Sequence, residues 1–276
     1  AEILLNLNFV IISQSMPPAL YLIPVEIGDS PLDMTIPSGN LRVVREIRTF
    51  IVENLRTARR CLRRWDREFP IDECTFHELN GHTPAIEISG FLDALRRGEP
   101  VGVMSEAGCP AVADPGAAVV EIAQREGLRV VPLVGPSSIL MSLMASGFNG
   151  QGFAFNGYLP ISEQDKLKAV KDLEARASRL GQTQIFIETP YRNNRMVSFL
   201  AEHLRPDTLL CVACDISSST ESIVTMPAAR WRNCRTDYDK RPAIFLIHRN
   251  DSVSDEKKEK KFFKEQNPRR ERRNGR

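Results

Sequence analysis

Two loops rich in small residues are the segments of this sequence most suited to binding a ligand. Residues 105–116, Ser-Glu-Ala-Gly-Cys-Pro-Ala-Val-Ala-Asp-Pro-Gly, follow the apolar run 101–104, and residues 134–138, Val-Gly-Pro-Ser-Ser, follow the apolar run 130–133. Small residues let a ligand approach the backbone, prolines stiffen a loop, and N–H groups ahead of a helix bind polar groups. Two such loops favour a ligand crevice over simple helix capping by the serines.

The segments around these loops alternate between short apolar runs and helical patterns, which is typical of a parallel α/β sheet. Ligands bind at the carboxyl ends of the strands in such sheets, where both loops begin. The expected strands are 19–23, 50–53, 75–79, 101–104 and 130–133, and the expected helices are 42–48, 55–65, 86–97 and 116–126.

A glycine-rich stretch at 143–157 predicts a boundary near residue 152, followed by a second unit of the same kind. Its expected strands are 153–156, 183–188, 209–215, 222–225 and 243–248. We therefore expect two side-by-side α/β domains with mainly parallel or mixed sheets, at 18–152 and 153–248. We expect residues 1–17 to be an upstream extension without a function, and residues 249–276 to be a disordered basic tail.

The composition, 42% hydrophobic and 26% charged residues, is ordinary for a soluble globular protein, and no apolar run approaches the roughly 20 residues of a membrane span. The six cysteines have neither the density nor the spacing of a disulfide framework, which favours a reducing, cytoplasmic setting. Cys211 and Cys214 have no second pair nearby, so we expect core cysteines and no metal site.

The formal net charge of +2 is unevenly distributed. Residues 249–276 hold eleven Lys/Arg against six Asp/Glu, a net charge of +5, which leaves −3 for residues 1–248. The tail is either an arm that binds the phosphates of a nucleic acid or a solvated, dispensable end. It is the only concentration of positive charge that we identify in the sequence.

Neither a Gly-x-Gly-x-x-Gly motif nor a Walker loop occurs, which disfavours a dinucleotide dehydrogenase or a P-loop nucleotidase. Instead, six ordered blocks resemble the tetrapyrrole methylase superfamily, and in particular its branch of small-subunit ribosomal RNA ribose 2′-O-methyltransferases. The blocks are 20–28, 105–116, 131–138, 145–147, 155–160 and 185–192.

The resemblance implies a two-domain α/β enzyme, usually a homodimer, that binds S-adenosylmethionine between its domains. The function that it implies is methylation of ribosomal RNA. Alternatives are a methyltransferase of the same superfamily acting on a tetrapyrrole-like small molecule, and a catalytically lapsed S-adenosylmethionine-binding protein. The cofactor-binding residues that it implies are Ser105, Glu106, Ala107, Gly108, Pro110, Pro136, Ser137, Ser138 and Ala213.

The sequence departs from the family pattern in three places. The acidic motif Glu-Asp-Thr-Arg-His-Thr becomes residues 53–58, Glu-Asn-Leu-Arg-Thr-Ala, which keep only the Glu and the Arg. Glu106 stands where the family usually has Asp, and Glu26 and Asp29 add negative charge to the first loop, where RNA would approach. These departures affect the RNA contacts more than the cofactor site.

Methyl transfer from a sulfonium is an in-line displacement, in which alignment of the reacting groups supplies much of the rate and neither a metal nor a covalent intermediate is needed. A ribose hydroxyl must also lose a proton, for which the candidate bases are Glu53 and Glu188. Arg56 and Arg192 are candidates for holding a phosphate. The alternative is that each glutamate pairs with its neighbouring arginine, which we favour for Glu53.

Overall fold

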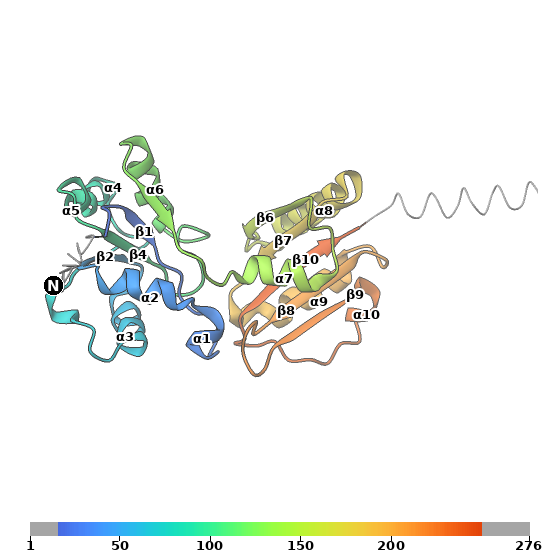
Figure 1. Cartoon of the computed structure of the whole chain (residues 1–276). Helices are drawn as coiled ribbons and strands as arrows, with labels where there is room; N and C mark the ends of the chain where they lie inside the picture. The colour runs from blue at the N-terminus through green and yellow to red at the C-terminus, as the bar shows by residue number, and fades with distance from the viewer. Residues whose placement is uncertain (1–15, 250–276) are drawn as a thin grey trace, which may run out of the picture. The chain divides into compact units, whose positions relative to one another are not determined.

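The structure, a computed structural model, describes residues 16–249 (Figure 1). The predicted extension at 1–17 and the predicted tail at 249–276 therefore lie almost entirely outside the described residues. The described chain divides into unit 1, residues 16–26 and 31–136, and unit 2, residues 27–30 and 137–249. The sequence-predicted boundary at 152 differs because helix α7 (Ser138–Ser146) packs against strands of the second sheet.

The sheet of unit 1 has five parallel strands, as the sequence predicts, and their order is β3-β2-β4-β1-β5. Parallel strands that are buried on both faces consist of near-continuous apolar residues, and β2 and β4 fit this pattern. The strands are β1 (Leu20–Leu22), β2 (Thr49–Val52), β3 (Thr75–Glu78), β4 (Val101–Met104) and β5 (Val130–Pro132).

Alternating side chains of these strands face two helical layers. Tyr21 and Phe50 pack with α2 and α3, whereas Leu20 and Ile51 pack with α4, α5 and α6. Figure 1 shows α2 and α3 below the sheet and α4, α5 and α6 above it. The helices are α1 (Leu32–Thr35), α2 (Ser38–Arg45), α3 (Leu55–Trp65), η1 (Ile71–Glu73), α4 (Ala85–Ile88), η2 (Ser89–Leu92), α5 (Asp93–Arg96) and α6 (Gly116–Arg125).

Unit 2 contains a mixed sheet in the order β6-β7-β10-β8-β9. Only β6 and β7 are parallel, and the other neighbours are antiparallel. The two units are thus both α/β, but their sheets differ in strand direction. The strands are β6 (Phe153–Tyr158), β7 (Thr183–Ile187), β8 (Leu209–Cys214), β9 (Ser222–Pro227) and β10 (Ala243–His248).

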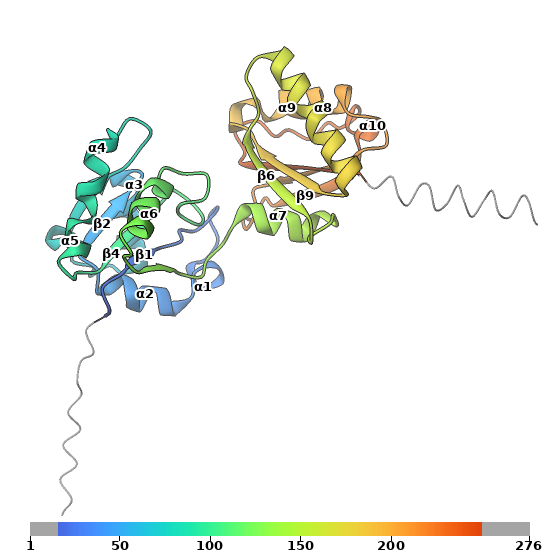
Figure 2. The ribbon, with the colours of Figure 1, turned by 90° about the horizontal axis from the view of Figure 1, so that it is seen from above.

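Helix α7 covers one face of the second sheet, and three helices cover the other, as Figure 2 shows. These three are α8 (Glu163–Leu180), α9 (Asn193–His203) and α10 (Ala228–Trp231), with the short η3 (Pro190–Arg192) before α9. Val170, Leu173 and Ala177 form the buried face of α8 at helical spacing. Cys211 and Cys214 are fully buried in β8.

Two negative findings concern the described part of the chain. No helix between residues 16 and 249 is long and apolar enough to cross a membrane. Over the same residues, no group of three or more His, Cys, Asp or Glu side chains is placed to hold a metal ion.

Candidate active site

The topology of unit 1 draws attention to the loop after β4, residues 105–115. Strand β4 lies between β2 and β1, whose connections lead to helices on one face of the sheet, whereas β4 leads to α6 on the other face. Adjacent strands whose connections leave on opposite faces open a crevice at their carboxyl ends. The loop after β4 therefore begins at such a crevice.

Three loops meet at this edge of the sheet. Val25, after β1, and Gly108, after β4, exchange two backbone hydrogen bonds of 2.9 Å. The thiol of Cys109 donates to the carbonyl oxygen of Pro136, after β5, at 3.3 Å. A Cβ atom on Gly135 would lie 2.1 Å from the Cβ of Pro24, so this close approach requires glycine. The two loops singled out in the sequence are thus in direct contact.

The backbone of the loop after β4 adopts several rare conformations. Gly108, Ala111 and Ala113 have φ angles of +71°, +66° and +62°. The Asp114 carboxylate accepts hydrogen bonds from the N–H groups of Ala111 at 3.0 Å and Gly116 at 2.7 Å, which fixes the turn. Left-handed alanines are unfavourable on their own, and such conformations cluster at ligand sites.

The predicted cofactor-binding residues of this loop separate into exposed and buried positions. Glu106 and Ala107 are exposed, whereas Ser105, Gly108 and Pro110 are buried. The Ser105 hydroxyl donates to the carbonyl oxygen of Ala107 at 3.1 Å, so it supports the loop from within.

The remaining predicted cofactor positions lie on other segments. Pro136 is buried, and Ser137 and Ser138 are partly buried. Ser137 caps α7 by accepting a hydrogen bond from the N–H of Leu140 at 3.4 Å. Ala213 lies in the middle of β8 in unit 2, where its side chain is fully buried in the core.

Glu53 directly follows β2 and lies beside the loop after β4. Its N–H donates to the carbonyl oxygen of Met104 at 3.1 Å, and its carboxylate accepts from the N–H of Glu106 at 3.1 Å. Burial raises the pKa of Glu53, and the nearby charges of Glu106 and Asp114 raise it further against the opposing effect of that hydrogen bond. Burial also raises the pKa of Asp114. This edge therefore carries partly buried carboxyl groups that hold protons more readily than usual.

Arg56 is exposed in the first turn of α3. Among the ion pairs of residues 16–249, none joins it to Glu53, so the favoured pairing of these two residues is wrong. The reason lies in the cap of α3: the Asn54 side chain accepts from the N–H of Thr57 at 3.0 Å, while the Glu53 carboxylate is bonded to Glu106 instead.

Glu188 and Arg192 in unit 2 form an ion pair, which is the alternative to a catalytic role that the sequence analysis left open. Arg192 donates to one Glu188 carboxylate oxygen from Nε at 2.9 Å and from Nη2 at 2.6 Å. The same oxygen accepts from the N–H of Thr189 at 2.7 Å. The Thr189 hydroxyl donates to it as well, at 3.3 Å, so the buried Glu188 carboxylate is already occupied by partners within unit 2.

Glu26 does not present its charge to an approaching polyanion, contrary to the sequence-based expectation. Its side chain is only 1% exposed. It accepts from Trp65 Nε1 at 2.9 Å and pairs with the guanidinium of Arg64 at 2.5 Å. These contacts of Glu26 hold the loop after β1 against α3.

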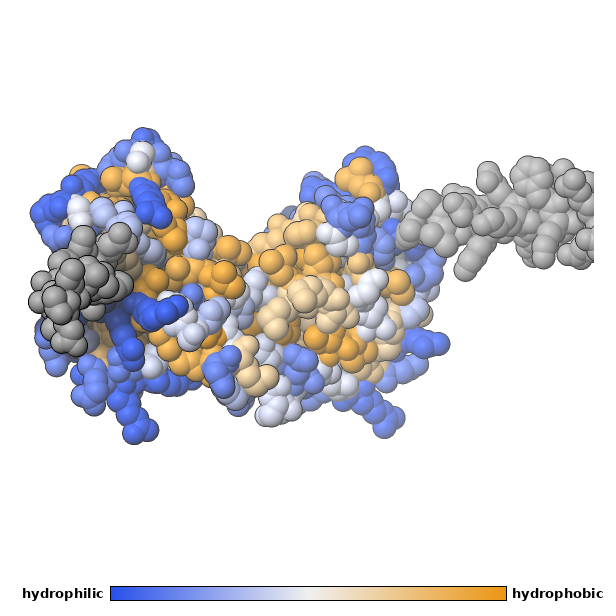
Figure 3. Space-filling view, viewed as in Figure 1, coloured by the Kyte–Doolittle hydropathy of each residue, from blue (hydrophilic) through white to orange (hydrophobic). Residues whose placement is uncertain are grey.

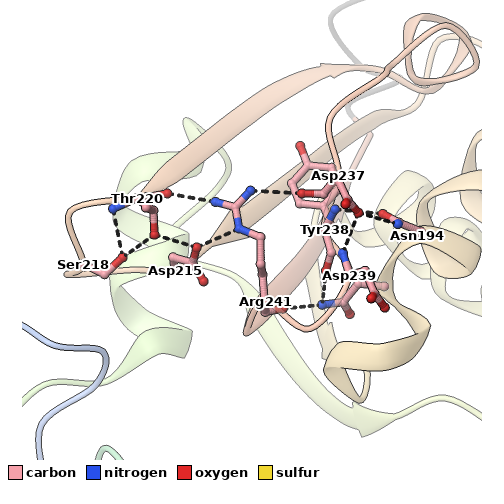
Figure 4. A network of polar contacts seen from close by, with 9 residues as sticks. Asn194, Asp215, Ser218, Thr220, Asp237, Tyr238, Asp239 and Arg241 are labelled. Carbon is pink, nitrogen blue, oxygen red and sulfur yellow. Dashed lines mark hydrogen bonds and ion pairs between the residues drawn. The ribbon is translucent and has the colours of Figure 1, made fainter.

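An ionic network in unit 2, which sequence reasoning missed, holds the loop after β8 (Figure 4). Arg241 Nε donates to Asp215 at 2.7 Å, and its Nη2 donates to the carbonyl oxygen of Thr220 at 2.9 Å. Gly28, with a φ of +71°, packs on this loop: a Cβ atom there would lie 3.2 Å from the carbonyl oxygen of Ile216. The sequence analysis included Asp215 in the expected strand 209–215 and contained no indication of this network.

Comparisons with known proteins agree with this architecture. The family model described as Tetrapyrrole (Corrin/Porphyrin) Methylases matches residues 20–230. The chain is 29% identical over 234 residues to the ribosomal RNA small subunit methyltransferase I of Vibrio cholerae, covering 84% of this chain and 77% of that protein. It is 32% identical over 213 residues to the protein of the same name from Pseudomonas aeruginosa, covering 76% and 70%.

Solved structures share the fold at lower sequence identity. The methyltransferase CobJ superposes with a TM-score of 0.57 at 17% identity, covering 83% of this chain and 93% of that one. The uroporphyrin III C-methyl transferase from Thermus thermophilus superposes with a TM-score of 0.51 at 17% identity, covering 83% and 97%.

Proposed function

Because this chain belongs to the tetrapyrrole (corrin/porphyrin) methylase family, we propose that it is an S-adenosylmethionine-dependent methyltransferase that methylates a ribose 2′-hydroxyl of small-subunit ribosomal RNA. The choice of RNA as substrate is supported by the relatives, which are named as methyltransferases of this RNA. The observation in the structure that carries the chemistry is Glu53, a partly buried carboxylate at the edge where three loops converge.

The residues at this edge fit the cofactor. When bound, S-adenosylmethionine supplies an electrophilic methyl group on a positively charged sulfonium. The carboxylates of Glu53 and Glu106 complement a cation, and the exposed Ala107 lets a ligand approach the loop backbone. We assign the cofactor to the loops 105–110 and 134–138, with Ser105, Gly108, Pro110 and Pro136 shaping them from within.

Glu53 is the better candidate for the residue that takes the proton from the ribose hydroxyl. Its raised pKa brings it closer to the working pH, which favours a general base. Glu188 accepts hydrogen bonds from Arg192 and Thr189. We therefore assign Glu188 and Arg192 to holding the local structure of unit 2. Arg56, three residues after Glu53 and exposed, is suited to binding a substrate phosphate.

Transfer of a tritiated methyl group tests the substrate class. We expect labelling of undermethylated small-subunit ribosomal RNA and none of a uroporphyrin-type tetrapyrrole offered at equal concentration. Labelling of the tetrapyrrole alone would move the substrate to the small-molecule branch of the family. Labelling of neither, with S-adenosylmethionine binding intact by calorimetry, would identify a binding protein without catalysis.

We also propose that the protein is a cytoplasmic homodimer. All six cysteines are free, which suits a reducing compartment. Unit 2 exposes several large apolar side chains, and such exposure is typical of surfaces that associate. These are Leu140, Met144, Phe153, Tyr158 and Ile161. Sedimentation at micromolar concentration should give a dimer, and a species of 31 kDa would contradict this proposal.

A further inference from the structure

Helix α3 carries an unusual concentration of one charge. Five of its eleven residues are arginines, and none is acidic. The buried residues Ala58, Cys61, Leu62 and Trp65 recur at helical spacing, so one face of the helix lies against the core. The arginines occupy the remaining surface, and all of them are exposed: Arg56, Arg59, Arg60, Arg63 and Arg64.

Three of these arginines lie in a row and form no ion pair with a carboxylate of the described residues. Arg56, Arg60 and Arg63 follow the spacing i, i+4 and i+7, which places them along one side of the helix. Arg64 pairs with Glu26, and Arg59 pairs with Asp72. Within residues 16–249, no carboxylate lies within ion-pair distance of Arg56, Arg60 or Arg63. We name these three residues the arginine row.

Helix stability explains only part of the arginine row: Arg63 lies in the last turn and donates to the carbonyl oxygen of Arg67 at 2.7 Å, whereas Arg56, in the first turn, is placed against the helix dipole. Like charges at i and i+4 destabilise a helix, and Arg56 with Arg60 is such a pair. An ordinary solvated helix face mixes both signs, as α8 does, which carries both Lys or Arg and Asp or Glu along its length. Figure 3 shows hydrophilic side chains projecting from the part of unit 1 where Figure 1 draws α3.

The arginine row starts next to the candidate active site. Helix α3 begins two residues after Glu53, so Arg56 lies at the end of the helix nearest the site, and Arg60 and Arg63 follow along its length. Glu26 is buried and paired, so of the two acidic residues in the loop after β1 only Asp29 is exposed. Arginine forks bind phosphate oxygens in bidentate fashion, which suits a polyanionic backbone better than a small substrate.

We infer that the arginine row binds the phosphate backbone of the RNA whose ribose enters the active site, an inference that rests on the proposed function. Positive charge is therefore concentrated in α3 as well as in the tail, which corrects the sequence analysis. RNA would contact the row without base-specific readout, so the row contributes affinity and salt dependence, not sequence choice.

The test compares two double variants of the full chain. Arg60→Gln with Arg63→Gln removes two charges from the row and keeps residues that favour helix formation. Arg125→Gln with Arg129→Gln is the matched control, because both arginines are exposed and Arg129 precedes β5 at the opposite, amino edge of the sheet. Affinity for a single-stranded fragment of undermethylated small-subunit ribosomal RNA is measured at several salt concentrations, together with S-adenosylmethionine affinity and methyl transfer.

The row variant should bind RNA about tenfold more weakly at low salt, with a plot of log K against log salt shallower by about 1.4, or about 0.7 for each lost phosphate contact. Its S-adenosylmethionine affinity and the RNA affinity of the control should be unchanged. Equal RNA affinity in the row variant and the unaltered protein would overturn the inference, as would an equal loss in the control. Methyl transfer by the unaltered protein is a separate measurement. If the unaltered protein transfers no methyl group but the row variant still loses RNA affinity, the proposed function is contradicted while the inference about the arginine row is supported.

Discussion

The N–H of Glu106 donates a hydrogen bond of 3.1 Å to the carboxylate of Glu53, which ties the loop after β4 to the end of the neighbouring strand β2. The bond leaves the carboxylate oriented at the edge where the loops after β1, β4 and β5 meet. A group that is both oriented and partly desolvated is suited to receiving a proton.

Glu53→Gln should lower kcat for methyl transfer by about 10²- to 10⁴-fold, the usual contribution of a general base. In the unaltered protein, activity should fall as the pH is lowered through the raised pKa of Glu53, and this acid limb should be absent from the residual activity of the variant. The pH profile of kcat/KM from pH 5 to 9 measures both. An unchanged acid limb in Glu53→Gln would assign the base elsewhere.

The same substitution has a predictable effect on stability. Because folding raises the pKa of Glu53, this carboxyl favours the folded state below its unfolded pKa, and that contribution is lost as the pH rises through the folded pKa. The neutral glutamine has no charge to desolvate, so Glu53→Gln should be at least as stable as the unaltered protein at pH 8. Thermal unfolding of both proteins at pH 5 and 8 measures the sign of the difference in stability between them.

Ala107→Trp should weaken S-adenosylmethionine binding by more than tenfold, because the bulky side chain would occupy the exposed part of the loop after β4. Gly108 is a poorer target, since its φ of +71° makes any side chain strained. Ala229→Trp, at an exposed alanine of α10, is the control. Calorimetry that finds equal affinity in Ala107→Trp and the control would refute the loop assignment.

Glu26→Ala should lower the free energy of unfolding by about 2 to 4 kcal/mol, because it leaves the indole N–H of Trp65 without its acceptor and removes the partner of Arg64. Glu99→Ala, which removes an exposed pairing with Arg97, should change it by less than about 1 kcal/mol. Urea unfolding of both variants measures the difference. Similar losses would show that burial of Glu26 adds nothing.

Deletion of residues 251–276 removes ten Lys/Arg and six Asp/Glu, a net charge of +4. RNA affinity should weaken and its salt dependence should flatten, while S-adenosylmethionine affinity stays the same. If deletion leaves the RNA affinity intact at 50 and 200 mM salt, the tail is dispensable. Combining the deletion with the Arg60→Gln and Arg63→Gln variant tests whether the tail and the arginine row contribute independently to RNA affinity.

Local patterns predicted much of the fold. The helical pattern of apolar residues placed α3 at its observed bounds, and every strand of the first sheet was found within about one residue. The expected helix 86–97 is instead three short pieces, α4, η2 and α5. Gly90 favours such a break, because glycine is a poor helix former. The antiparallel pairing in unit 2 depends on long-range contacts that periodicity does not record.

The sequence predicted which loops form the candidate site, but it did not predict the contacts between their residues. Strand ends and small residues located 105–116 and 134–138, because parallel strands bring their carboxyl ends to one edge. The sequence could not show that Glu26 turns inward, or that Glu53 bonds to Glu106 and not Arg56. Each of these depends on a partner on another element, and neither residue spacing nor charge identifies it.

The assignment of residues 27–30 to unit 2 means that the chain passes between the two units three times, at 26/27, 30/31 and 136/137. A gene fragment cut at residue 136 would leave Ile27, which is buried in a core cluster of unit 2, on the wrong polypeptide. A single crossover at residue 136 between two relatives would therefore pair Ile27 of one protein with a core cluster of unit 2 from the other.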